Sequence, residues 1–142
     1  YSWNDLFPWY EQNSYTKPKK VITLFPAVDI ETLWERDTEF YGIKSRDTEY
    51  IWGTPQEYPE RYERVNTIIL ADKNAPETLI IHGWSDTLIP SDTVLALNKK
   101  LTQLWVSNTL KIIPVAQHGY TYFTGSFVFQ ISRGIMKEFL NN

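Results

Sequence analysis

The chain has 142 residues, a length typical of one domain with its own core, and its formal net charge of −3 argues against binding to nucleic acid or to an anionic membrane. The absence of cysteine excludes disulfides, thiolate catalysis and cysteine metal ligands, and no apolar run approaches the roughly 20 residues that span a bilayer. No signal peptide is evident, so any export signal is expected outside these residues. The sequence leaves the compartment undecided, with a cytoplasmic location favoured.

Residues 1–18 are predicted to form an irregular aromatic leader. Its aromatic side chains are Tyr1, Trp3, Phe7, Trp9, Tyr10 and Tyr15. Such a cluster normally needs a partner surface. Tyr1 is not an initiator and Met136 is the only methionine, so we expect the chain to be part of a longer protein.

The first predicted strand covers residues 19–25, which are rich in branched apolar side chains, and Pro26 ends it. Asp29 is predicted to cap a helix over residues 30–40. Residues 36–75 are predicted to form a lid-like insertion, because they are polar, charged and aromatic without strong periodicity. One helical turn is expected within them, around residues 55–62.

The second half of the chain alternates strand and helix. Residues 78–81 form a short apolar run typical of a buried strand, and Ser91 is predicted to cap the helix that follows. The apolar face of that helix carries Val94, Leu97, Leu101, Leu104 and Trp105. A strand over residues 110–115 and a helix over residues 126–140 complete the pattern. The apolar stripe of this last helix is Val128, Ile131, Ile135 and Phe139.

This order predicts an α/β fold with three mostly parallel strands, flanking helices on both faces and a single domain over residues 1–142. Parallel sheets usually have more strands. We therefore expect the edge at residues 19–25 to pair with a missing amino-terminal half of the same domain or with a second copy of the chain, or the aromatic leader to fold over the exposed sheet.

Asp86 and His118 are the candidate catalytic residues. Each follows a predicted parallel strand, and the carboxyl ends of such strands form the edge where ligands and catalytic groups of open α/β sheets collect. Separately, Asp86 also suits a turn residue that binds local backbone amides, and His118 also suits a loop histidine that only meets water. Their positions on neighbouring strands favour an acid and base pair.

These residues make the chain resemble the carboxyl-terminal part of an α/β-hydrolase, in the esterase and prolyl-oligopeptidase-like branch. The matching segments are FPAVDI at 25–30, WGTPQEYPERY at 52–62, PETLIIHGWSDTLIP at 76–90 and QHGY at 117–120. The resemblance runs from about residue 19 to the end and is loose in the leader. It implies a partial α/β-hydrolase fold in which Asp86 is the triad acid and His118 the general base.

The resemblance also implies a nucleophilic serine in a G-x-S-x-G elbow before the first strand. None of the eight serines lies in that pattern. They are Ser2, Ser14, Ser45, Ser85, Ser91, Ser107, Ser126 and Ser132. We therefore expect the serine, the oxyanion hole and the first strands in an amino-terminal part outside this chain.

Three further residues are candidates for a structural or substrate-binding role. His82 ends the buried strand and is interpreted as a hydrogen-bonded structural histidine. Trp84 is a substrate-binding candidate that could instead cover the strand end, and Trp52 is a second candidate that could instead form the underside of the lid. No metal is expected, because no HExxH-type spacing is present, and no cofactor is expected.

The resulting hypothesis is the carboxyl-terminal portion of a serine hydrolase that acts on a small-molecule ester or an acylated substrate. This chain alone is expected to be inactive without its nucleophile. Two alternatives stay open. One is a prolyl-oligopeptidase-like serine peptidase, and the other is a non-catalytic interaction module that pairs through its open sheet edge.

Overall fold

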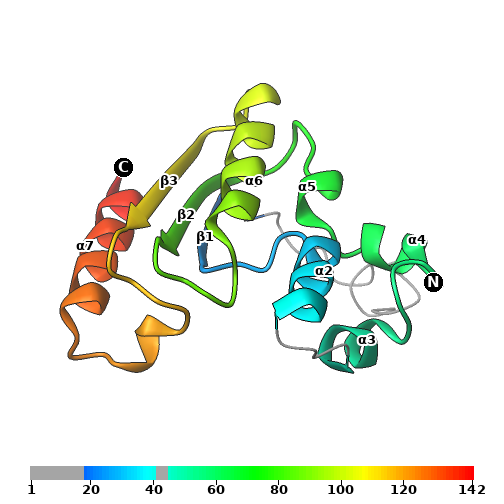
Figure 1. Ribbon diagram of the computed structural model, residues 1–142. Coiled ribbons are helices and arrows are strands. Elements are labelled where there is room, and N and C mark those ends of the chain that lie inside the picture. Colours follow the sequence, from blue (N-terminus) through cyan, green and yellow to red (C-terminus); the bar gives the residue numbers. More distant parts are fainter. Residues whose placement is uncertain (1–17, 41–44) are drawn as a thin grey trace, which may run out of the picture.

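The computed structural model describes residues 18–40 and 45–142, and the predicted aromatic leader lies almost entirely outside them. A three-stranded sheet forms the centre (Figure 1). The elements in chain order are β1 (Lys20–Leu24), α2 (Ile30–Phe40), α3 (Ser45–Ile51), α4 (Pro59–Glu63), α5 (Thr67–Leu70), β2 (Glu77–Gly83), α6 (Ser91–Gln103), β3 (Asn108–Ile113), the 3₁₀ turn η1 (Tyr120–Tyr122) and α7 (Phe127–Asn141).

The sheet has the order β1-β2-β3, and both strand pairs are parallel, as predicted. Ile22 pairs with Leu79, and Ile80 pairs with Leu110. The central strand β2 is buried along nearly its whole length, which explains its continuous apolar sequence. All three carboxyl ends therefore meet at one edge.

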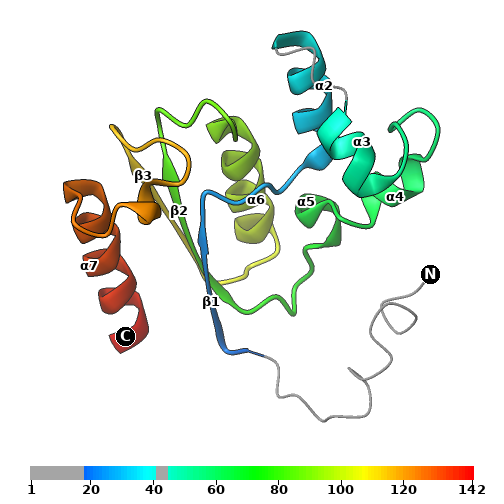
Figure 2. The same ribbon diagram turned by 90° about the horizontal axis from the view of Figure 1, so that it is seen from below.

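Side chains that alternate along β2 form two cores, one on each face of the sheet. Ile80 packs with Val94 and Leu101 of α6 on one face. Leu79 and Ile81 belong to the other core, with α7 against them. The two views place α6 and α7 on opposite sides of the sheet (Figures 1 and 2). The predicted covering of both faces is confirmed, as is the apolar stripe of α7.

The predicted face of α6 is wrong at its last residue. Trp105 is 96% exposed, whereas Leu104 packs against the core. The helix ends at Gln103, and Trp105 adopts a left-handed backbone conformation with φ of 59°. Since that conformation breaks the helical repeat, the indole leaves the apolar face.

Of the two predicted helix caps, Asp29 is confirmed and Ser91 is wrong, and Ser126 is a further cap that the sequence did not single out. Asp29 Oδ1 accepts from the Thr32 amide at 3.3 Å, and Ser126 accepts from the Phe129 amide at 3.1 Å. Ser91 is not a cap, because it is the first residue of α6 and Pro90 precedes it in the cap position. The Thr93 hydroxyl donates to the Pro90 carbonyl at 2.8 Å and ties that turn instead.

The region predicted as a lid holds three short helices, α3, α4 and α5, where the sequence predicted one helical turn. Together with α2 they lie on the α6 side of the sheet, away from α7 (Figures 1 and 2). Asn66 fastens this region to the start of α2, since its side-chain amide donates to Asp29 Oδ1 at 3.0 Å. Tyr62 lies in the same region and is fully buried, and its hydroxyl donates a hydrogen bond to the Gly53 carbonyl at 2.9 Å.

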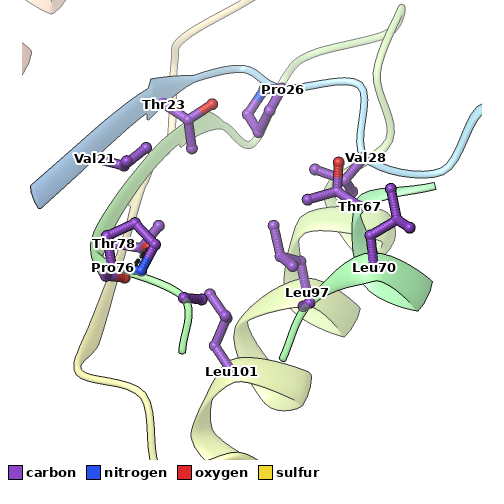
Figure 3. Close-up of a pocket in the computed structure, with 12 residues that line it drawn as sticks. Val21, Thr23, Pro26, Val28, Thr67, Leu70, Pro76, Thr78, Leu97 and Leu101 are labelled. Atoms are coloured by element: carbon purple, nitrogen blue, oxygen red, sulfur yellow. Dashed lines mark hydrogen bonds between the residues drawn. The ribbon is translucent and has the colours of Figure 1, made fainter. Parts of the chain in front are cut away.

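Among the described residues, β1 pairs only with β2, so its outer edge carries no strand. A cavity of about 350 Å³ lies beside this strand on the α6 face. The side chains around it are mostly apolar and come from β1, β2, α5 and α6 (Figure 3). A partner for this edge stays a prediction.

Candidate active site

The end of β2 touches the loop that follows β3, and a glycine makes the contact possible. A β-carbon on Gly83 would lie 2.2 Å from the Ala116 carbonyl oxygen, which no side chain could tolerate. Beyond Gly83, the Trp84 amide donates to the Ile113 carbonyl at 3.0 Å. The Ser85 amide then donates to the Ala116 carbonyl at 3.1 Å. These contacts join the loop of Asp86 to the loop of His118.

The two carboxylate oxygens of Asp86 have different partners. Oδ1 accepts from the backbone amides of Leu88 at 3.0 Å and Ile89 at 2.8 Å. Oδ2 lies 3.1 Å from Nδ1 of His118. The side chain is fully buried. Asp86 therefore binds local backbone amides with one oxygen, as expected of a turn residue, and contacts His118 with the other.

His118 is oriented by Asp86 and by aromatic neighbours. A carboxylate can only accept, so the proton lies on Nδ1 and the lone pair of the neutral ring lies on Nε2. The side chain is 32% exposed, and Nε2 makes no hydrogen bond within the described part of the chain. Such a nitrogen can take a proton from a group placed before it. The contact predicted between Asp86 and His118 is thus observed, whereas their catalytic roles stay predictions.

Phe25 is a residue of this site that the sequence did not single out. Its ring meets the His118 ring edge-on, with centroids 4.8 Å apart, and meets the Tyr120 ring at 5.4 Å. Phe25 follows β1 directly and has a φ of 40°, a conformation rare for a residue with a bulky side chain. Its position just past the carboxyl end of β1 was the available signal, because that edge also holds Asp86 and His118.

His82 is fully buried beside the pair. Its Nε2 lies 3.0 Å from the Ile89 carbonyl and 4.0 Å from Asp86 Oδ2. Burial lowers the pKa of His82, and the nearby Asp86 charge opposes that shift only in part. His82 therefore remains neutral at neutral pH and is a hydrogen-bonded structural residue, as interpreted from the sequence.

Comparison with known families shows to which family the chain belongs. The BD-FAE family model matches residues 4–101, more than half of the chain. The chain belongs to the BD-FAE family. The match includes Asp86 and ends before His118, and it begins inside the leader, where the resemblance noted from the sequence is only loose.

Solved structures resemble this BD-FAE chain over most of its length. An acylaminoacyl peptidase from Pyrococcus horikoshii has a TM-score of 0.74 at 24% identity, over 91% of this chain and 20% of its own. A truncated carbohydrate esterase from gut microbiota has a TM-score of 0.61 at 20% identity, over 84% and 42%. The esterase Est2 of Thermogutta terrifontis has a TM-score of 0.59 at 18% identity, over 86% and 42%. No curated protein matches the chain significantly.

These likenesses establish the fold. The BD-FAE chain has a partial α/β-hydrolase fold and spans between 20% and 42% of these three structures.

Of the serines in the described part, Ser85 donates to the Pro114 carbonyl and Ser132 to the Phe129 carbonyl, so neither hydroxyl proton is directed at His118.

The two tryptophans predicted to bind substrate are both exposed in the BD-FAE chain. Trp84, two residues before Asp86, is 64% exposed, so its ring does not cover the strand end. Trp52 is 80% exposed and is therefore not part of a packed lid underside. Its backbone is left-handed with φ of 59°, and its carbonyl accepts from Arg61. Contact of either ring with substrate stays a prediction.

The described part of the chain holds neither a candidate metal site nor a candidate membrane span. Residues 18–40 and 45–142 contain no group of three or more histidine, cysteine or acidic side chains placed to hold a metal ion. Within the same residues, no helix is long and apolar enough to cross a membrane.

Proposed function

We propose that this chain supplies the acid and the base of a serine hydrolase that cleaves carboxylic esters. The observation that carries the proposal is the hydrogen bond of 3.1 Å between His118 Nδ1 and the buried Asp86, at the carboxyl edge of a parallel sheet. It leaves Nε2, the nitrogen that must exchange a proton with the nucleophile, without a hydrogen-bond partner in the described chain.

In the proposed reaction, His118 Nε2 takes the serine hydroxyl proton while the serine oxygen attacks the ester carbonyl. The protonated ring then gives that proton to the departing alcohol, which leaves an acyl-serine. Water repeats the sequence, again with His118 as base, and releases the acid and the free serine. Asp86 holds the ring tautomer and stabilises the imidazolium in both halves.

The nucleophile is proposed to come from outside the described sheet, on a strand that pairs with the open edge of β1. The absence of a G-x-S-x-G pattern in the sequence supports this, as does the fraction of the related structures that the chain spans. The apolar cavity beside β1 would receive the helix that follows such a strand (Figure 3). The chain without that part is proposed to be inactive.

Small or acylated esters are the proposed substrates, supported by the printed names of two structural relatives, a carbohydrate esterase and the esterase Est2. A peptidase is the second candidate. It is favoured by the acylaminoacyl peptidase, which has the higher TM-score of 0.74. The two differ in the leaving group, an alcohol or an amine, and both use the same acid and base.

The test uses the full-length protein with a p-nitrophenyl ester and, in parallel, an acylated peptide p-nitroanilide. We expect His118→Ala and Asp86→Asn each to lower kcat by at least about 10³-fold. Asp92→Asn is the matched control, because Asp92 is an exposed aspartate whose carboxylate lies 3.6 Å from Arg36 and accepts from the neighbouring Thr93 amide at 2.9 Å. Unchanged hydrolysis in both site variants would remove these residues from the mechanism, and a preference for the anilide would favour the peptidase.

A further inference from the structure

The turn that carries Asp86 is closed through a single residue, Ile89. Its amide donates to Asp86 Oδ1 at 2.8 Å, and its carbonyl lies 3.0 Å from Nε2 of His82. Ile89 is thus bound at both of its backbone polar groups, once by the acid and once by a side chain of β2. Because β2 is the central strand, His82 connects the turn to the most buried part of the sheet.

The tautomer of His82 follows from its partners. A carbonyl oxygen can only accept, so the bond to Ile89 requires the proton on Nε2. Nδ1 is then the nitrogen with the lone pair, and it is buried without a hydrogen-bond donor among the described residues. The other tautomer would bury an N–H group without an acceptor and place two lone pairs against each other.

The charge of His82 matters as well as its proton. Its Nε2 lies 4.0 Å from Asp86 Oδ2, the same oxygen that His118 approaches at 3.1 Å. A positive ring at His82 would compete with His118 for that carboxylate. Burial lowers the pKa of His82 and so keeps it neutral, which leaves Oδ2 to His118.

We infer that His82 is a positioning residue for the acid. By holding the Ile89 carbonyl, it keeps the amides of Leu88 and Ile89 directed at Oδ1, so that Asp86 presents Oδ2 to His118. The role of His82 in holding the turn is argued from the described contacts alone. Its role in catalysis rests on the proposed function.

Two substitutions that differ by one methylene separate this role from simple packing. In His82→Gln the side-chain amide reaches about as far as Nε2 and can still donate to the Ile89 carbonyl. In His82→Asn the amide stops near the position of Nδ1 and cannot. Both keep a polar group in the same buried place, so a difference between them reports the hydrogen bond.

The first measurement is hydrogen exchange of the full-length protein, read on the peptide segment that holds residues 84–90. We expect about tenfold faster exchange of the Leu88 and Ile89 amides in His82→Asn than in His82→Gln, with exchange in residues 78–81 alike in the two. Equal exchange of the turn in both variants would overturn the positioning role, and so would faster exchange spread evenly over β2.

The second measurement is hydrolysis of the p-nitrophenyl ester by the same proteins. We expect kcat to fall about tenfold or more in His82→Asn with KM little changed, and to recover in His82→Gln. A rise in KM with kcat unchanged, or no recovery in His82→Gln, would contradict the inference. If the wild type does not hydrolyse the ester, the proposed function fails, while hydrogen exchange still decides whether His82 holds the turn.

Discussion

Gly83 and Ala116 approach each other so closely that a β-carbon on Gly83 would lie 2.2 Å from the Ala116 carbonyl oxygen. This contact joins the end of the central strand to the loop that leads to His118. The neighbouring Ser85 amide bonds the same carbonyl at 3.1 Å. The distance between Asp86 and His118 is therefore set by backbone contacts as well as by their own hydrogen bond.

The first prediction concerns this contact. Gly83→Ala should lower the free energy of unfolding by about 1–3 kcal/mol, because the added methyl meets rigid backbone. It should also lower the proposed ester hydrolysis, because the two loops must separate. The measurement is urea denaturation together with hydrolysis of the p-nitrophenyl ester.

Gly134→Ala is the matched control for that substitution. Gly134 lies inside α7, and a β-carbon there would meet nothing within 4 Å. The alanine should therefore raise the free energy of unfolding by up to about 1 kcal/mol through helix propensity. Equal stability of the two variants would show that the Gly83 contact is not tight.

The second prediction concerns the pH dependence of stability. Burial lowers the pKa of His82 in the folded protein below its ordinary value of 6.5, so the unfolded chain binds a proton more readily. The contribution of His82 is fully present above about pH 6.5 and is lost as the pH falls from there towards the folded pKa. The slope from this one group is at most about 1.4 kcal/mol per pH unit.

The check is the free energy of unfolding from pH 7.5 down to pH 5, compared between the wild type and His82→Gln. Glutamine does not titrate, whereas Asp86 and His118 are present in both proteins and cancel. The wild type should lose more stability over this interval. Parallel curves would mean that His82 is not kept neutral by burial.

The sequence could predict the parts of this site that follow from topology. Asp86 and His118 each come just after a strand of one parallel sheet, so their residues had to lie at the same edge. It could also predict the stripe of α7, because each apolar residue there recurs at helical spacing. Neither prediction depends on the detailed path of the backbone.

Other features depend on local backbone geometry that no periodicity encodes. The bond between His82 and the Ile89 carbonyl exists only because the turn over residues 84–90 bends back onto β2. Trp105 has the spacing expected for the apolar stripe of α6. Its own backbone is left-handed, however, and this conformation at the helix end directs the side chain into solvent. Phe25 likewise contacts His118 from a backbone conformation with an unusual φ, and no feature of the neighbouring sequence predicts that φ.

The third prediction uses that unusual backbone of Phe25. Replacing Phe25 by alanine removes the ring contacts with His118 and Tyr120 and keeps the strain of a β-carbon at φ of 40°. Replacing it by glycine removes the same contacts and relieves the strain. We expect Phe25→Gly to be more stable than Phe25→Ala by about 1 kcal/mol, the reverse of the usual order. Thermal unfolding of both variants measures the difference, and a more stable alanine variant would contradict it.

The fourth prediction tests whether the cavity beside β1 is filled in the full-length protein. Leu70 lines this cavity and is 52% exposed, while its neighbour Ile69 is 57% exposed and lies outside the lining. If a helix from the remaining part of the fold packs into the cavity, Leu70→Asp buries an unpaired charge at that contact. Leu70→Asp should then cost the full-length protein about 2 kcal/mol or more, whereas Ile69→Asp should change stability by less than about 0.5 kcal/mol. Both substitutions place the same charge on the same short helix α5, so propensity and net charge cancel between them. Equal losses, measured by urea denaturation of the two variants, would mean that the cavity is open to solvent and that the proposed additional strand and helix do not attach there.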